Sequence, residues 1–92
     1  MEAKDLELLF VKQLDAVHVE IIDQSAGHTG HLGFQSGGGH FQALIVSPRF
    51  ENLSTLDRHR LVYELVGMPN NPAIHALSMK TLTPAEWKKS SL

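Results

Sequence analysis

Histidine is the residue type in this chain best suited to chemistry, with six copies in 92 residues. An imidazole titrates near neutral pH and is the commonest metal ligand in proteins, so a group of histidines indicates a metal site or a proton-transfer site. Four of them lie in segments that could converge after folding: His28, His31, His40 and His75. Taken alone, each is better explained as a solvated loop residue or, for His75, as a hydrogen-bonded residue at the edge of the core.

Cysteine is absent from the chain, which excludes thiolate metal ligands, thiol nucleophiles and disulfides. Any site for a softer metal must therefore use histidine. No serine lies in a strained elbow sequence, and the acidic residues occupy helix faces, capping positions or a strand end instead of forming a catalytic pair. We therefore expect a protein that is not an enzyme.

A short basic run, Arg58-His59-Arg60, lies within a predicted helix. Two interpretations fit this run equally well. One is a surface that contacts phosphate groups or an acidic partner, and the other is a solvated helix face with His59 partly packed. We take these three residues and His40 as candidate partner contacts. The formal net charge is −2 and the remaining cations are scattered, which disfavours a domain built mainly to bind nucleic acid.

Residues 25–39 contain most of the glycine and show no apolar periodicity, so a long mobile loop is predicted here. Loops of this length in small domains are usually functional. Gly27 to Gly30 matches a GxxG pattern, but it lies between predicted strands, whereas the nucleic-acid-binding version joins two helices. Gly37 to Gly39 leads into a strand and lacks the helix N-terminus of a phosphate cradle. We interpret these glycines as giving the loop freedom to move.

Hydrophobic periodicity predicts the elements that must position these residues. Apolar residues recur at three- and four-residue steps in the predicted helices and alternate in the predicted strands. Ser54 and Gly67 are the expected caps of the long helix, and Trp87 is expected to anchor the last helix on the core. The predicted elements are a helix at 2–15, strands at 17–22 and 40–47, a short turn or helix through 50–53, a helix at 55–66, a strand at 73–81 and a short helix from 83.

The predicted order is α-β-β-α-α-β-α, in which the first two strands form an antiparallel hairpin and the middle helices cross over to the third strand. The chain length suits one hydrophobic core, so residues 1–92 are expected to form a single domain. Neither an export signal nor an apolar run near the ~20 residues of a membrane span is found. We therefore expect a cytoplasmic protein.

Several blocks of the sequence resemble the BolA family. In chain order they are Val19–Ser25, Gly39–Phe41, Ile45–Ser47, Phe50–Glu51, Leu53–Ser54, Arg58–Tyr63, Ile74–Ser78 and Lys80–Trp87. Together these blocks extend over nearly the whole chain. The resemblance implies an α+β, class II KH-like (BolA-like) fold with a three-stranded mixed sheet covered by helices, in agreement with the predicted element order.

The resemblance also implies a function. BolA proteins bind monothiol glutaredoxins and share a bridging 2Fe-2S cluster with them, for which the glutaredoxin supplies one cysteine and glutathione supplies another thiolate. The BolA protein supplies its C-terminal histidine and a ligand from the loop between its first two strands. The matching positions are His75 and His28, with His31 as the alternative loop ligand. The implied role is iron-sulfur cluster assembly or trafficking, or iron and redox regulation.

Two other functions remain alternatives at this point. Some bacterial BolA proteins are described as DNA-binding transcriptional regulators, and that function would rest here on the basic residues Arg58, Arg60, Lys80, Lys88 and Lys89. A simple histidine site for zinc or copper, without a glutaredoxin, is the other alternative. The sequence leaves homodimerisation open.

Overall fold

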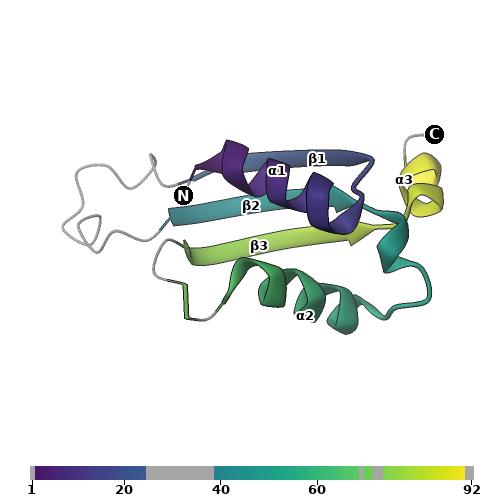
Figure 1. The fold of residues 1–92 in the computed structure, drawn as a ribbon. Coiled ribbons are helices and arrows are strands. Elements are labelled where there is room, and N and C mark those ends of the chain that lie inside the picture. The colour runs from purple at the N-terminus through teal and green to yellow at the C-terminus, as the bar shows by residue number, and fades with distance from the viewer. Residues whose placement is uncertain (1, 25–38, 69, 72–73, 91–92) are drawn as a thin grey trace.

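The computed structural model describes residues 2–24, 39–68, 70–71 and 74–90. The elements are α1 (Ala3–Leu14), β1 (His18–Asp23), β2 (Gly39–Val46), the 3-10 turn η3 (Pro48–Phe50), α2 (Thr55–Val66), β3 (Ile74–Leu82) and α3 (Pro84–Ser90) (Figure 1). The predicted element order is confirmed, and the predicted boundaries agree closely with these. Among the helices so described, none combines the length and the apolar character needed to span a membrane.

The three strands form one mixed sheet in the order β1-β2-β3. β1 and β2 pair antiparallel, with Asp23 opposite Phe41. β2 and β3 pair parallel, with Phe41 opposite Leu77. A parallel pair needs a long crossover connection, and α2 lies within it. The α+β class and the mixed sheet are therefore as predicted.

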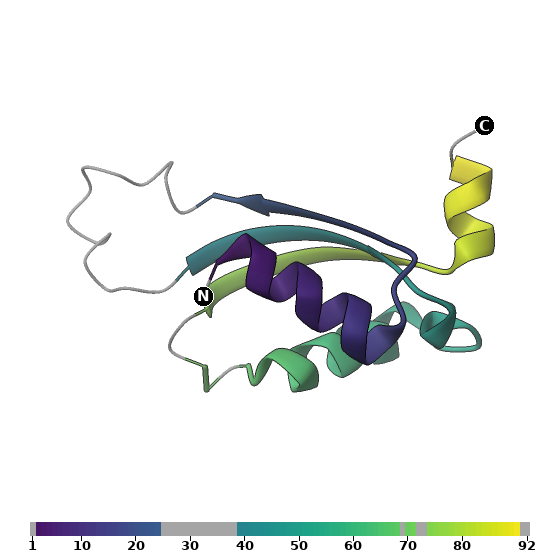
Figure 2. The same ribbon diagram turned by 45° about the horizontal axis from the view of Figure 1, so that its top comes forward.

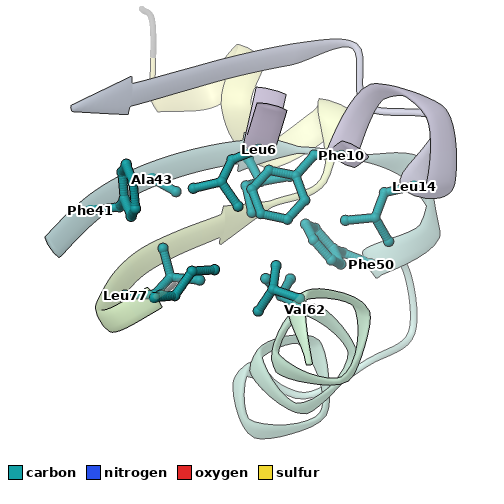
Figure 3. Close-up of a cluster of buried hydrophobic side chains, with 11 residues drawn as sticks. Leu6, Phe10, Leu14, Phe41, Ala43, Phe50, Val62 and Leu77 are labelled. Carbon is teal, nitrogen blue, oxygen red and sulfur yellow. The ribbon is translucent and has the colours of Figure 1, made fainter. Parts of the chain in front are cut away.

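The hydrophobic core lies between the sheet and the two longer helices. α1 and α2 lie on the same face of the sheet (Figure 2). The stripe of α1 predicted from three- and four-residue spacing points inward, because Leu6, Phe10 and Leu14 are at most 1 % exposed. Alternate residues of the strands meet these side chains (Figure 3). The other members of the core are Phe41, Ala43, Ile45, Phe50, Val62, Val66, Ile74 and Leu77.

Both predicted caps of α2 are present. The hydroxyl of Ser54 accepts a hydrogen bond from the N–H of Asp57 at 3.1 Å. At the other end Gly67 has a φ of 77°, in the left-handed region where a side chain would be strained. This conformation lets the N–H of Met68 donate to the carbonyl oxygen of Tyr63 at 3.0 Å. The helix therefore ends where the chain must turn towards β3.

The side chain of Arg58 ties α2 to the end of β3 and to α3. It is only 9 % exposed. Its guanidinium donates to the carbonyl oxygens of Leu53 at 3.0 Å and Thr81 at 3.1 Å, and to Oε1 of Glu86 at 2.7 Å. A buried cation is tolerated only when it is paired and hydrogen-bonded, and Arg58 meets both conditions.

α3 stands at the end of the sheet, and none of its residues is buried. A capping box forms its first turn: the hydroxyl of Thr83 accepts from the N–H of Glu86 at 3.2 Å, and the Glu86 carboxylate accepts from the N–H of Thr83 at 2.8 Å. The ring of Trp87 stacks on the ring of His18, with centroids 4.8 Å apart. The expected anchor is thus present, but it contacts a β1 histidine instead of the core.

Substitution of a core side chain on α1 should be far more costly than substitution of an exposed one. We expect Phe10→Ala to lower the free energy of unfolding by about 3–5 kcal/mol, because it removes a fully buried ring and leaves a cavity. The matched control is Leu8→Ala on the same helix, where the native side chain is 58 % exposed, and it should change stability by less than about 0.5 kcal/mol. Urea unfolding followed by circular dichroism measures both. Equal losses would contradict this placement of α1.

The carboxylate of Glu86 should make stability depend on pH in the acid range. Its hydrogen bonds with the Arg58 side chain and the Thr83 N–H lower its pKa from the usual 4.5 to about 2. A folded-state pKa below the unfolded one stabilises the protein above pH 4.5, and this contribution is lost as the pH falls towards 2.

Glu86→Gln removes this titration and keeps the size of the side chain. We therefore expect the stability difference between native protein and variant to be largest above pH 4.5 and to shrink towards pH 2. Unfolding measured at a series of pH values tests this. A difference that stays constant with pH would show that the carboxylate charge of Glu86 does not stabilise the fold.

Candidate functional site

The segment that carries His28 and His31 is attached at one end of the sheet. It follows β1, which ends at Asp23, and precedes β2, which begins at Gly39. Because β1 and β2 are antiparallel neighbours, both attachment points lie side by side. We call this end of the sheet, formed by the end of β1 and the first residues of β2 and β3, the histidine end.

Hydrogen bonds hold these attachment points together beyond the strands themselves. The N–H of Gln24 donates to the carbonyl oxygen of His40 at 2.7 Å. The side-chain amide of Gln24 also donates to that of Gln42 at 3.2 Å. His40 is half-buried and lies second in β2. These bonds fix the backbone of Gln24 and His40, beside the points at which the segment begins and ends.

β3 begins at the same end of the sheet, with His75 as its second residue. Gly39 pairs with Ile74 and His40 with Ala76, so the register shifts here and His75 is the inserted residue. Such irregularities change the direction of a side chain relative to a regular strand and are frequent beside functional sites. The backbone of His75 therefore lies beside the first residues of β2.

The proposed ligand side chains themselves are not placed. His28 and His31 fall outside the described residues, and of His75 only the backbone is described. Their ligand roles therefore stay predictions. Among the residues that the structure does describe, no group of three or more His, Cys, Asp or Glu side chains could hold a metal ion. What the fold brings together is the backbone of His75, His40 and both ends of the segment that carries the loop histidines.

The basic run on α2 is not the surface cluster that the sequence suggests. Arg58 is buried and its guanidinium is bonded within the chain, so it serves the fold and is not exposed for a partner. His59 is half-buried. Arg60 is exposed, with 71 % of its side chain accessible and Asp57 at 4.0 Å. Only His59 and Arg60 of this run remain accessible at the surface.

These α2 residues also lie far from the histidine end. Arg58 is bonded to the carbonyl oxygen of Thr81, near the last residue of β3, whereas His75 is near its first. Six residues of extended strand separate the two positions, which corresponds to about 20 Å. The structure therefore divides the candidate residues between two ends of the molecule, with His40 and His75 at one and the basic run at the other.

Sequence reasoning missed the contacts that hold α3. The capping pattern from Thr83 to Glu86 is visible in the sequence. The hydrogen bond from Arg58 to the same Glu86 carboxylate is not, because it joins residues that are distant along the chain. The stacking of His18 on Trp87 was not predicted either, and His18 Nε2 also lies 2.6 Å from a carboxylate oxygen of Glu20. Alternation along β1 was the one available signal, because it places His18 and Glu20 on the same face of the sheet.

The chain was compared with known families and proteins. A family model described as BolA-like protein matches residues 10–86. A BolA-like protein from Dictyostelium discoideum is 40 % identical over 88 residues, which are 95 % of this chain and 75 % of that protein. A Haemophilus influenzae protein named DNA-binding transcriptional regulator BolA is 34 % identical over 83 residues, which are 90 % of this chain and 78 % of the relative. The chain spans only about half the length of the mouse and human proteins named BolA-like protein 1.

The fold is shared with solved structures as well. A Bol-like protein from Babesia bovis matches with a TM-score of 0.80 and 33 % sequence identity, covering 100 % of this chain and 95 % of that one. The sequence match, the relatives and the common fold agree with one another. The chain belongs to the BolA family.

Proposed function

We propose that this chain is a partner protein, not an enzyme, which binds a monothiol glutaredoxin and supplies histidine ligands to a 2Fe-2S cluster shared with it and with glutathione. Cluster assembly or trafficking, or iron and redox regulation, would be the cellular role. The observation that carries the proposal is the histidine end. There the backbone of His75 lies beside the start of β2, where the segment that contains His28 and His31 ends, and one strand away from the end of β1, where that segment begins.

The donor atoms of the chain suit half of such a site. With six histidines and no cysteine, it offers imidazole nitrogens and no thiolate. Two histidines replace two cysteines on one iron of a Rieske centre, so imidazole is an accepted ligand for a 2Fe-2S cluster. The remaining thiolates must then come from outside, which is what a glutaredoxin and glutathione provide. When bound, the cluster supplies one-electron chemistry, and histidine ligation raises its reduction potential.

His75 would be the fixed ligand of the pair and His28 the loop ligand, with His31 as the alternative. A ligand in a strand is held by the neighbouring backbone, whereas one in a long connection adjusts its position when the partner binds. His40 lies on β2, between the end of β1 and the start of β3. In this proposal it would lie at the rim of the partner contact. In this proposal Arg58 only stabilises the fold that presents the histidines, and His59 and Arg60 lie too far away to line the cluster.

DNA binding is the second candidate, and the name of the Haemophilus relative favours it. Specific binding depends on several phosphate contacts. Arg58 is buried and therefore does not contribute a phosphate contact. The remaining candidate cations are Arg60, Lys80, Lys88 and Lys89. We therefore consider DNA binding less well supported than cluster binding.

Substitution of the proposed ligands should change the spectrum of a mixed complex. The chain, a monothiol glutaredoxin, glutathione, iron and sulfide are combined, and visible absorption and circular dichroism are compared with those of the glutaredoxin alone. We expect a new heterodimer spectrum, altered in His75→Ala and in one of His28→Ala and His31→Ala. Sedimentation of the mixture reports the heterodimer independently of the cluster.

The matched control is His18→Phe, which removes a histidine at the opposite end of the sheet and keeps an aromatic ring against Trp87. This variant should give the native spectrum. If no heterodimer forms, or if the spectrum of the mixture equals that of the glutaredoxin alone, the cluster proposal is wrong. If His18→Phe changes the spectrum as much as His75→Ala does, the assignment of ligands to the histidine end fails.

DNA binding by this chain is tested separately. A gel-shift titration at several salt concentrations should show weak binding without sequence preference, because few exposed cations are clustered. Lys88→Gln with Lys89→Gln should abolish what binding remains, while Glu7→Gln serves as a surface control. Salt-sensitive and sequence-specific binding at physiological ionic strength would instead make DNA binding the better supported function.

A further inference from the structure

β1 is an edge strand, and its outer side is open in the part of the chain that the structure describes. It pairs only with β2, and no other described strand lies along its outer edge (Figure 1). The N–H of Gln24 bonds directly to His40, the residue opposite it, so the even-numbered residues of β1 exchange hydrogen bonds with β2. The backbone N–H and C=O groups of Val19 and Ile21 therefore point to the outer side. No bond from another described residue reaches them.

The other edge of the sheet is closed by side chains. On β3 the carbonyl oxygen of Leu77 accepts from the hydroxyl of Tyr63 at 3.3 Å, and that of Thr81 accepts from Arg58 at 3.1 Å. Both carbonyls lie on the side of β3 away from β2, and both donors come from α2. A strand added there would have to displace these contacts. β1 is thus the edge at which the sheet can be extended.

Unpaired edges of this kind are usually protected by charge, by a bulge or by a covering segment, because they attract other strands. β1 carries one charged side chain in its middle, Glu20, and next to it an isoleucine, Ile22, that is 55 % exposed. Val17, just before the strand, is 63 % exposed. The edge is therefore short and partly apolar, and only Glu20 discriminates between possible pairings.

We propose that β1 pairs antiparallel with β1 of a second copy of this chain, about a twofold axis at Val19. This register places each His18 opposite Glu20 of the other copy, and Val17 opposite Ile21. The N–H of Val17 donates to the carbonyl oxygen of Val46 on β2 at 2.8 Å, so the backbone hydrogen bonds between the copies centre on Val19. Imidazole thus meets carboxylate on the open face of the sheet, while apolar side chains meet on the face covered by helices. The pairing joins two three-stranded sheets into one continuous sheet, and its contact is isologous.

The neighbouring registers are less favourable. An axis at Glu20 places that carboxylate directly opposite itself, and like charges directly opposite one another are destabilising. An axis at Ile21 sets Glu20 against Ile22. The axis at Val19 avoids both arrangements. The same two side chains already meet within one chain, where His18 Nε2 lies 2.6 Å from a carboxylate oxygen of Glu20. The ring of Trp87 stacks on the imidazole ring and holds it in place. Across the axis the two pairs would form an alternating array of four side chains.

The pairing buries a short edge, so we expect a weak dimer that forms as the concentration rises. Because the chain has no cysteine, a single introduced cysteine reports self-association directly. Residues opposite one another in a hydrogen-bonded antiparallel pair have Cα atoms about 5.5 Å apart, within the range of a disulfide. Val19→Cys should therefore form a disulfide-linked dimer under mild oxidation. Ile21→Cys should not form this disulfide. With the axis at Val19, Ile21 faces Val17 of the other copy, and the introduced cysteine of that copy lies four residues further along the strand.

Leu56→Cys is the control for accidental oxidation, since Leu56 is 60 % exposed on α2, away from β1. Preferential cross-linking at Val19→Cys supports the proposal. Preferential cross-linking at Ile21→Cys, or equal cross-linking at all three positions, overturns it. Circular dichroism of the reduced variants establishes that each one is folded.

Exchange of the charges tests the register without cysteine. Glu20→Lys faces His18 of the other copy at two symmetric positions, and we expect it to weaken dimerisation about tenfold in sedimentation velocity. Adding His18→Glu places a carboxylate opposite each introduced ammonium group and should restore the dimer. A native protein that stays monomeric at its highest soluble concentration, or a double variant no better than Glu20→Lys, contradicts the proposal.

Discussion

The double pairing of β2 is the constraint on which the rest of this structure depends. As the central strand it pairs antiparallel with β1 and parallel with β3, and both registers are set along its length. Its inward residues Phe41, Ala43 and Ile45 face α1 and α2, so the same registers align the core. They also bring the beginning of β3 to the start of β2, where the long connection ends. A one-residue slip would turn the core residues outward.

Most of the fold was predictable because its signals are local. Leucine and phenylalanine at helical spacing identify α1, alternation identifies the strands, and Ser54 and Gly67 mark the ends of α2. Arg58 was not predictable from such signals. A basic residue between two polar neighbours on a helix looks solvated, and its burial becomes apparent only when Thr81 and Glu86, distant along the chain, supply the carbonyl and carboxylate that satisfy it.

The candidate site was predictable in residue type and in part by position. The absence of cysteine and the number of histidines define the available chemistry, and the strands set the end of the sheet at which His40 and His75 lie. The resemblance to the BolA family, and not periodicity, singled out His75 and His28. Strand registers place the backbone of His75 and the start and end of the connecting segment. They do not determine which of its histidines faces a partner, because that depends on the conformation of the connection.

The central claim is that histidine nitrogen of this chain binds iron in a cluster shared with a glutaredoxin. It is tested most directly by labelling only this chain with ¹⁵N-histidine, assembling it with unlabelled glutaredoxin and glutathione, and recording pulsed electron paramagnetic resonance spectra of the reduced cluster. The account predicts strong ¹⁵N hyperfine couplings that weaken in His75→Ala. A heterodimeric cluster with no ¹⁵N coupling from the labelled chain would contradict it, since all of the ligands would then come from the partner and glutathione.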